Sequence, residues 1–164
     1  MTREMLTTDA LKQLYYTLIF PHLFYCHTVW GGVSHNKMNS ITVAQKRVIR
    51  TISFKRKFHH TSPCFKKLSI LKLIDVTKYC FALFVYKSLN NHAPNNFFQY
   101  STNGRYDLRN NNLLRIPLVM STQSQTSIIY RGAKIWNDTP SNIKDKNSIY
   151  SFKRSLKMSL MLNY

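Results

Sequence analysis

The sequence predicts a mainly α-helical fold, because three stretches carry apolar residues at helical spacing. Side chains three and four positions apart fall on one side of an α-helix, so each stretch presents one apolar side. The chain has 164 residues, 44% of them apolar, which is enough for a hydrophobic core. The apolar sets are Leu11, Leu14, Tyr15 and Leu18; Ile41, Ala44, Val48 and Ile52; and Ile149, Phe152, Leu156 and Leu160.

The first helix is expected to start at Thr8 or Asp9, either of which is a suitable N-cap. Pro21 should kink or restart it, because proline donates no backbone hydrogen bond and its ring clashes with a carbonyl one turn back. Gly31 and Gly32 then end it. The apolar run from residue 14 to residue 30 is shorter than the roughly 20 residues of a membrane span. We therefore expect a buried core helix and no membrane partner.

A second helix is expected over residues 36–54, with Lys46, Arg47 and Arg50 opposite its apolar side. A basic run, Lys55, Arg56 and Lys57, follows and leads to a break at Pro63. Residues 71–90 predict a third helix, in which apolar side chains are too dense for a surface helix. This third helix should lie at the centre of the fold.

An Asn-rich stretch divides the chain into two halves, so we expect a helical region over 1–90, a connection over 91–112 and a C-terminal region over 113–164. Residues 113–120 contain Pro117 and are at best an edge strand. Residues 127–136 fit a strand or a helix, so the C-terminal region is predicted to be α+β or helical. It ends in a basic amphipathic helix bordered by Lys146, Lys153 and Lys157.

The charge of the chain favours an anionic partner. Lys and Arg total 24 against 6 Asp and Glu, for a formal net charge of +18. Nucleic acid is the first candidate partner, because cations that displace counterions from phosphates gain affinity without reading the base sequence. An anionic membrane surface is the second candidate on charge alone, although we expect no membrane partner. A basic balance is an electrostatic footprint and does not define a binding mode.

Catalytic and metal-binding motifs are weak in this sequence. No two acidic residues are adjacent or at helical spacing, as a two-metal site requires, and no nucleophile elbow or phosphate loop is present. We therefore assign no catalytic residue, metal or cofactor. The candidate zinc ligands match no paired Cys-x-x-Cys spacing and are better explained as loop histidines and core thiols. They are His59, His60 and Cys64, with Cys26, His27 or Cys80 as the remaining ligands.

The cysteines and the N-terminus bear on location. Three widely spaced cysteines argue against a disulfide framework and favour a reducing compartment, with buried thiols as the expected state. Residues 1–10 carry no secretory signal pattern. These observations favour the cytoplasm or the nucleus, and the basic run around Lys55 suits nuclear import.

Aromatic residues alternate with cations in the basic part of the chain. Phe54, Phe58 and Phe65 lie among the lysines and arginines. Such side chains stack on bases in single-stranded nucleic acid complexes, while Lys and Arg follow the backbone. The alternative is that they belong to the core, because large aromatics usually bury most of their area.

Short blocks occur in a fixed order from about residue 11 to residue 162. They are Leu14-Tyr15-Tyr16 through Ile19, Pro21-His22-Leu23 and Tyr25 to Val29-Trp30-Gly31; Ala44-Gln45-Lys46-Arg47-Val48-Ile49-Arg50; Phe65-Lys66-Lys67-Leu68 with Ile70-Leu71-Lys72-Leu73 and Tyr86-Lys87; Tyr106 with Arg109-Asn110; Arg131-Gly132-Ala133-Lys134-Ile135-Trp136-Asn137 with Pro140; and Ser151-Phe152-Lys153. The series resembles the region after the palm in the reverse transcriptases of jockey-like non-LTR retrotransposons. The order of the blocks is more specific than any single block.

The resemblance implies a fragment of an RNA-directed DNA polymerase from a transposable element. The region would be the thumb and the post-thumb part, which help to hold template and primer, an RNA/DNA hybrid or duplex, without reading bases. The catalytic carboxylates of that family lie in the palm, so the chain is not expected to be an enzyme on its own. We expect the contacts to phosphates from Lys46, Arg47, Arg50, Lys55, Arg56, Lys57, Lys153 and Lys157.

Two alternatives stay open at this point. The first is a protein-interaction scaffold, whose basic faces meet acidic proteins and whose apolar surface over residues 14–30 meets the missing palm domain or a second copy of the chain. The second is a decayed element with no present function.

Overall fold

The computed structural model describes residues 6–32, 35–93, 97–100, 113–162 and 164. In these ranges the only β pairing is an isolated antiparallel bridge between Tyr100 and Leu114, and the rest is helical or irregular, which confirms the prediction of a mainly α fold. The elements are α1 (Thr8–Leu14), η1 (Tyr15–Ile19), α2 (Phe20–Phe24), α3 (His27–Trp30), α4 (His35–Ile52), α5 (Ser62–Leu68), α6 (Leu73–Leu89), η2 (Ser124–Thr126), α7 (Ile128–Asp138), α8 (Ser141–Lys144) and α9 (Ile149–Leu162).

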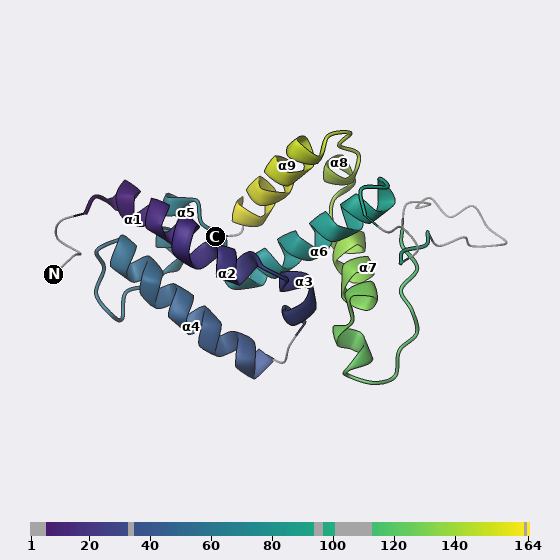
Figure 1. The fold of residues 1–164 in the computed structure, drawn as a ribbon, viewed down its shortest axis with the longest axis horizontal. Helices are drawn as coiled ribbons and strands as arrows, with labels where there is room; N and C mark the ends of the chain where they lie inside the picture. Colours follow the sequence, from purple (N-terminus) through teal and green to yellow (C-terminus); the bar gives the residue numbers. More distant parts are fainter. Residues whose placement is uncertain (1–5, 33–34, 94–96, 101–112, 163) are drawn as a thin grey trace.

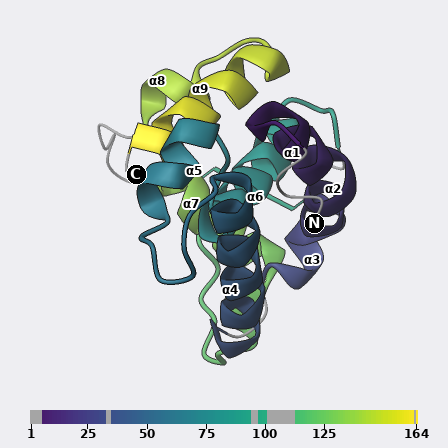
Figure 2. The same cartoon turned by 90° about the vertical axis from the view of Figure 1, so that its left-hand side faces the viewer.

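Helix α6 is the centre of the molecule, as its apolar density predicts. Two views at right angles place α9 on one side of it and α4 on the other, with α7 packed along its second half (Figures 1 and 2). Most of its side chains are buried, including Val76, Phe81 and Val85. The C-terminus returns to the first half, where the Tyr164 hydroxyl accepts a hydrogen bond of 2.8 Å from the backbone N–H of Lys72.

The first helical stretch is interrupted twice. Its N-cap is Thr7, whose hydroxyl accepts from the backbone N–H of Ala10 at 3.3 Å, so the predicted caps Thr8 and Asp9 are wrong by one and two positions. A π-turn over Tyr15–Ile19 follows, and α2 then begins with Pro21 in its first turn. Proline is tolerated there, because the first N–H groups of a helix have no intrahelical partner. The predicted restart near this proline is confirmed.

This stretch covers the core with one side only. Tyr15 and His27 are buried, but Leu18, Tyr25 and Val29 are 63%, 76% and 79% exposed. The prediction of a fully buried core helix is therefore wrong, because the break and the turn at Tyr25 leave one side without a neighbour in the described part of the chain. None of the described helices combines the length and the apolar character that crossing a bilayer requires.

Helix α4 packs through a side that is rotated from the one that its apolar residues predict, and Ile52 belongs to both sides. Its fully buried residues are Gln45, Ile49 and Ile52, whereas Ala44 is exposed and Val48 only half-buried. The buried side of α4 is rotated from the predicted one because a glutamine, Gln45, lies at its centre. A pattern built from apolar residues alone does not assign a polar side chain to the core.

The Gln45 side chain joins three elements. Its Nε2 donates to the Tyr15 hydroxyl at 3.0 Å and to the Leu71 carbonyl at 2.9 Å, while its Oε1 accepts from the backbone N–H of Leu73 at 2.9 Å. The last contact satisfies one of the free N–H groups at the start of α6. Gln45 is 3% exposed, so each of these polar groups would be costly to bury alone.

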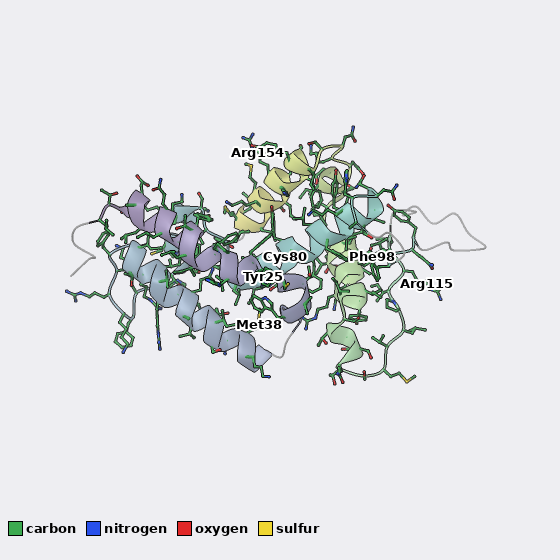
Figure 3. The ribbon with its side chains drawn as sticks, in the orientation of Figure 1. Tyr25, Met38, Cys80, Phe98, Arg115 and Arg154 are labelled. Atoms are coloured by element: carbon green, nitrogen blue, oxygen red, sulfur yellow. The ribbon has the colours of Figure 1, made fainter. Side chains whose placement is uncertain are left out.

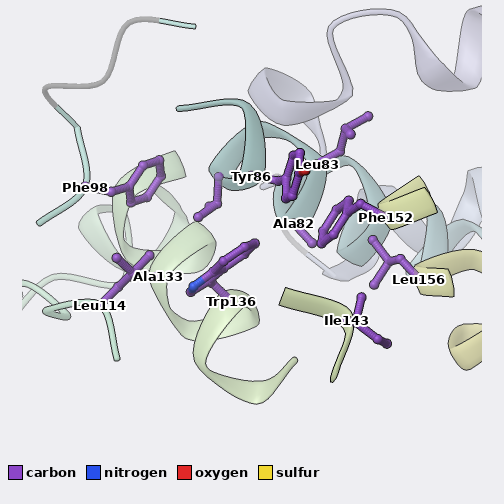
Figure 4. Packing of buried hydrophobic residues seen from close by; sticks show 11 residues of the cluster. Ala82, Leu83, Tyr86, Phe98, Leu114, Ala133, Trp136, Ile143, Phe152 and Leu156 are labelled. Carbon is purple, nitrogen blue, oxygen red and sulfur yellow. The ribbon is translucent and has the colours of Figure 1, made fainter. Parts of the chain in front are cut away.

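A core cluster of buried hydrophobic residues lies between α6 and the C-terminal region (Figure 4). The rings of Tyr86 and Phe152 stack with centroids 4.2 Å apart, and Trp136 lies 6.0 Å from Phe152. A Cβ on Gly132 would lie only 3.0 Å from the Phe98 ring, so this glycine allows α7 to approach its neighbours closely. Helix α6 thus serves both predicted regions, 1–90 and 113–164. Residues 94–96 and 101–112 of the predicted connection lie outside the described part.

The C-terminal region is built from helices. The stretch that fitted a strand or a helix forms α7, and the amphipathic C-terminal helix is confirmed as α9, with Phe152 and Leu156 buried. Residues 113–120 are extended. The backbone N–H of Leu114 donates to the side-chain oxygen of Asn137 at 2.8 Å, and the side-chain nitrogen of Asn137 donates to the Leu114 carbonyl at 3.0 Å. Helices α5 and α8 are not predicted by the sequence patterns. In α5, Pro63 stands in the first turn and so begins a helix where we expected only a break.

Replacing Gln45 with leucine should destabilise the fold strongly. The change leaves the Leu73 N–H and the Leu71 carbonyl without their partner, and an unsatisfied buried group costs roughly 1–3 kcal/mol. We expect a loss of about 2–4 kcal/mol in the free energy of unfolding, measured by chemical denaturation. The control is Tyr15→Phe, which removes only the hydroxyl that accepts from Gln45 and should cost about 1 kcal/mol. Equal effects of the two variants would contradict this role of the carboxamide.

His27 is a buried titratable group between α3 and α6. Its Nδ1 lies 2.7 Å from the Leu23 carbonyl, which can only accept, so Nδ1 carries the proton. Its Nε2 lies 2.8 Å from the Thr77 hydroxyl, which also lies 3.1 Å from the Leu73 carbonyl and has one proton to donate to either acceptor. Burial lowers the pKa of His27, and the bond to the Leu23 carbonyl only partly opposes that shift. The folded state therefore favours the neutral imidazole.

The stability of the protein should fall as the pH drops below about 6.5, the ordinary pKa of histidine. The pKa of His27 is lower in the folded state than in the unfolded state, so the unfolded chain binds the proton first as the pH falls. The free energy of unfolding therefore decreases until the pH has passed below the folded pKa. Denaturation of His27→Gln between pH 7.5 and 5 should show a smaller pH dependence than the wild type. The exposed His22 provides the control, since His22→Gln should keep the wild-type profile. A wild-type profile that is flat over this range would refute the assignment.

Candidate nucleic-acid interface

The cations are concentrated in a part of the chain that has no acidic residues. Between Asp9 and Asp75 the sequence holds eleven Lys and Arg and not one Asp or Glu. Across the described ranges, the single ion pair within 4.0 Å joins Lys78 to Asp75, with 3.8 Å between Nζ and Oδ1. Salt bridges between described residues therefore neutralise little of this charge.

Six of the predicted contact residues lie on α4 and on the loop between α4 and α5, and we call them the α4–α5 basic surface. Two of its cations project from α4, next to residues of the buried stripe, and three come from the loop that follows; all five are exposed. The sixth, Arg50, is half-buried and donates from Nε to the His59 carbonyl at 2.9 Å, which ties the loop to the helix. The members are Lys46, Arg47, Arg50, Lys55, Arg56 and Lys57.

This surface contains a hollow of about 300 Å³. Cationic side chains from α4 and from the residue before α6, Lys46, Arg50 and Lys72, line it together with His59 and His60. None of its lining residues is acidic. The hollow can accept an anion such as a phosphate through Lys46 and Arg50, whereas the Nζ of Lys72 also lies 4.2 Å from the centroid of the Tyr164 ring.

The three aromatic residues of the basic part have different environments. Phe65 is 1% exposed and belongs to the core, which confirms the core alternative for this residue. Phe54 is partly exposed. Phe58 is 92% exposed at the hollow, and the Nζ of Lys57 lies 5.9 Å from its ring centroid. Of the three, Phe58 has the geometry for stacking on an unpaired base.

The two predicted lysines of α9 lie elsewhere. Lys153 and Lys157 are half-buried and line a separate cavity of about 240 Å³ with apolar walls. Helix α9 is on the opposite side of α6 from α4 (Figures 1 and 2), so the predicted contact residues fall into two groups. Burial lowers the pKa of Lys157, and the positive charge of Lys12 lowers it further. The outward side of α9 carries Arg154 instead (Figure 3).

Sequence reasoning missed three residues of the hollow. The sequence pattern assigned His59 and His60 only as candidate zinc ligands, and Lys72 only as part of one of the ordered blocks. Their shared signal is position, since His59 and His60 end the basic loop before α5 and Lys72 precedes α6. Only the packing of α6 against α4 brings Lys72 to the same surface.

The candidate zinc ligands do not converge. Among the described residues, no three His, Cys, Asp or Glu side chains lie close enough to hold a metal ion. All three cysteines are free thiols: Cys64 and Cys80 are buried as expected, whereas Cys26 is exposed. Burial raises the pKa of Cys80 to about 12, which makes it a poor nucleophile at neutral pH.

Comparison with known proteins adds no relative. No family model, curated protein or solved structure matches the chain significantly. The functional argument therefore rests on the residues and their arrangement.

Proposed function

We propose that this chain is a nucleic-acid-binding module that contacts the phosphate backbone without reading the base sequence. The proposal includes an origin in the thumb and post-thumb region of a jockey-like non-LTR retrotransposon reverse transcriptase, which the ordered sequence blocks support. In this proposal the chain has no polymerase activity of its own, and its partner is the template-primer duplex.

The observation that carries the proposal is the α4–α5 basic surface. Its cations stand on a helix that Gln45 fixes to the core, and the hollow beside them has no acidic residue in its lining. Phosphates neutralise such a surface and release their counterions, which is the main source of affinity in sequence-independent binding. Long exposed lysine and arginine side chains suit this task because they adapt to the backbone of any sequence.

Binding to an RNA/DNA hybrid should depend steeply on salt. Each neutralised phosphate contributes about −0.9 to the slope of log K against log salt for B-form DNA. The triple variant Lys46→Gln, Arg47→Gln, Lys57→Gln should weaken binding and reduce the magnitude of this slope by about 2 to 3. Fluorescence anisotropy at salt concentrations between about 50 and 300 mM measures both quantities. Arg50 is left intact because it holds the loop through the His59 carbonyl.

A matched control removes the same charge elsewhere. Lys134, Lys146 and Arg154 are exposed residues outside the α4–α5 basic surface, and changing all three to glutamine should leave the salt slope unchanged. If both triple variants lose the same amount, only the net charge matters and the surface is not an interface. A hybrid that does not bind at low salt would refute the proposed function itself.

A second candidate function, a protein-interaction scaffold, is favoured by one observation. Leu18, Tyr25 and Val29 leave a row of apolar side chains exposed along η1, α2 and α3. Exposed apolar patches on a folded protein commonly mark contact sites with another protein. In this reading the partner is the missing palm domain or a second copy of the chain.

Self-association through this row should depend on protein concentration. Light scattering after gel filtration should detect reversible oligomers that the double variant Leu18→Gln, Val29→Gln converts to monomers. Leu118 is a matched control, because it is fully exposed on the extended segment, away from this row. If Leu118→Gln abolishes the oligomers equally, or if the wild type is monomeric at every concentration, self-association through this row is ruled out.

A further inference from the structure

The cavity beneath α9 combines apolar walls with two cations. Six of its eight lining residues are aromatic or leucine: Tyr16, Phe20, Phe24, Leu71, Tyr79 and Leu83. The other two are Lys153 and Lys157, one helical turn apart on α9. No residue of the lining is acidic. The cavity therefore has an apolar interior and a positive edge.

The walls are held in place by contacts between rings. Tyr16, Phe20 and Phe24 form a row along η1 and α2, with centroid distances of 5.4 Å and 5.5 Å between neighbours. Tyr79 of α6 closes the row, 6.5 Å from Phe24. The π-turn before Pro21 contributes to this row, because it shifts the register of the side chains that follow Tyr15.

The lysines at the edge are unneutralised and partly desolvated. In the ranges that the structure describes, neither lysine has a carboxylate within 4.0 Å. Lys157 lies with its Nζ 5.9 Å from the Tyr16 ring centroid, and its burial and the nearby Lys12 lower its pKa. A cation in such surroundings gains most from an anion that also replaces water on the neighbouring apolar walls.

We propose that this cavity binds an amphipathic monocarboxylate, with its hydrocarbon body against the aromatic row and its carboxylate between Lys153 and Lys157. The cavity volume of about 240 Å³ exceeds the roughly 150 Å³ of an engineered apolar cavity that admits benzene. The site is distinct from the α4–α5 basic surface, which lies on the other side of α6 and has cations around a more polar hollow.

A nucleotide fits this cavity less well, although it also combines an aromatic group with negative charge. Base edges need hydrogen-bond partners, and the lining offers few beyond the two lysines. The Tyr16 hydroxyl already donates to the Ser69 carbonyl at 3.3 Å. An apolar body leaves no polar edge unsatisfied, which favours the carboxylate with a hydrocarbon chain.

The first experiment compares ligands on the unmodified chain. Decanoate, decanol and decyltrimethylammonium have the same hydrocarbon chain with a negative, neutral and positive head. Calorimetric titration below the micelle concentration should give one site for decanoate, binding of decanol weaker by about tenfold or more, and no binding of the cation. AMP should not compete with decanoate. Equal affinity for decanoate and decanol, or competition by AMP, would overturn the proposal.

The second experiment tests the lysines. Methionine preserves most of the length and apolar character of the lysine stem, so Lys153→Met and Lys157→Met should each reduce decanoate affinity about tenfold and leave decanol binding unchanged. Lys134→Met removes an exposed lysine of α7 and should have no effect. Equal losses in all three variants would attribute binding to net charge and refute the site. The triple variant Lys46→Gln, Arg47→Gln, Lys57→Gln changes no residue of the cavity lining and should bind decanoate normally, so the two proposals fail independently.

Discussion

The fold depends on one buried carboxamide. Gln45 is the only residue of α4 that bonds both to the first helical stretch and to the start of α6 among the described contacts. Its position is constrained because three polar groups bond to it at the same time. The orientation of α4 follows from this requirement. Lys46 and Arg47 are then directed outward, since they are the next residues around the helix.

Helix α6 explains why the two halves of the chain behave as one body. In its first half Val76 and Cys80 pack with Leu71, and its second half packs against Phe152 and Trp136. Both faces of a helix are buried only when elements from distant parts of the chain cover it. A large positive charge then has to lie outside these cores, which places the cations on the outer helices and loops. The distribution of charge is in this sense a consequence of the central helix.

The sequence predicts the strongly periodic helices well, because apolar spacing reports burial directly. Helices α4, α6 and α9 lie where their patterns place them. The rotation of α4 was not predictable in this way, because the residue at the centre of its buried side is Gln45. Helix α5 was missed because Pro63 was treated as a break, although a proline in a first turn costs a helix little. Thr7 was missed as a cap because Thr8 and Asp9 beside it have the same capping chemistry.

The candidate site shows a similar division. Lys46 and Arg47 are exposed as predicted, because a residue opposite or beside a buried stripe faces solvent whatever its neighbours are. Lys153 and Lys157 have the same spacing as a solvated basic face, but they lie over an aromatic cavity, which depends on the packing of α9 across η1 and α2. Lysine spacing along a helix therefore indicates a shared side, whereas the surroundings of that side come from tertiary packing.

Because their surroundings differ, the two groups of cations should attract anions with a different dependence on salt. Exposed cations such as Lys46 and Arg47 keep their water until a phosphate arrives, and salt screens their attraction over about 8 to 10 Å at physiological ionic strength. Lys157 is already half-buried, which lowers its pKa, so an anion that reaches it interacts at short range in a medium of lower polarity. Salt should weaken binding at the α4–α5 basic surface much more than binding in the cavity beneath α9. Ionic strength therefore separates the two activities in a single preparation of the wild-type chain.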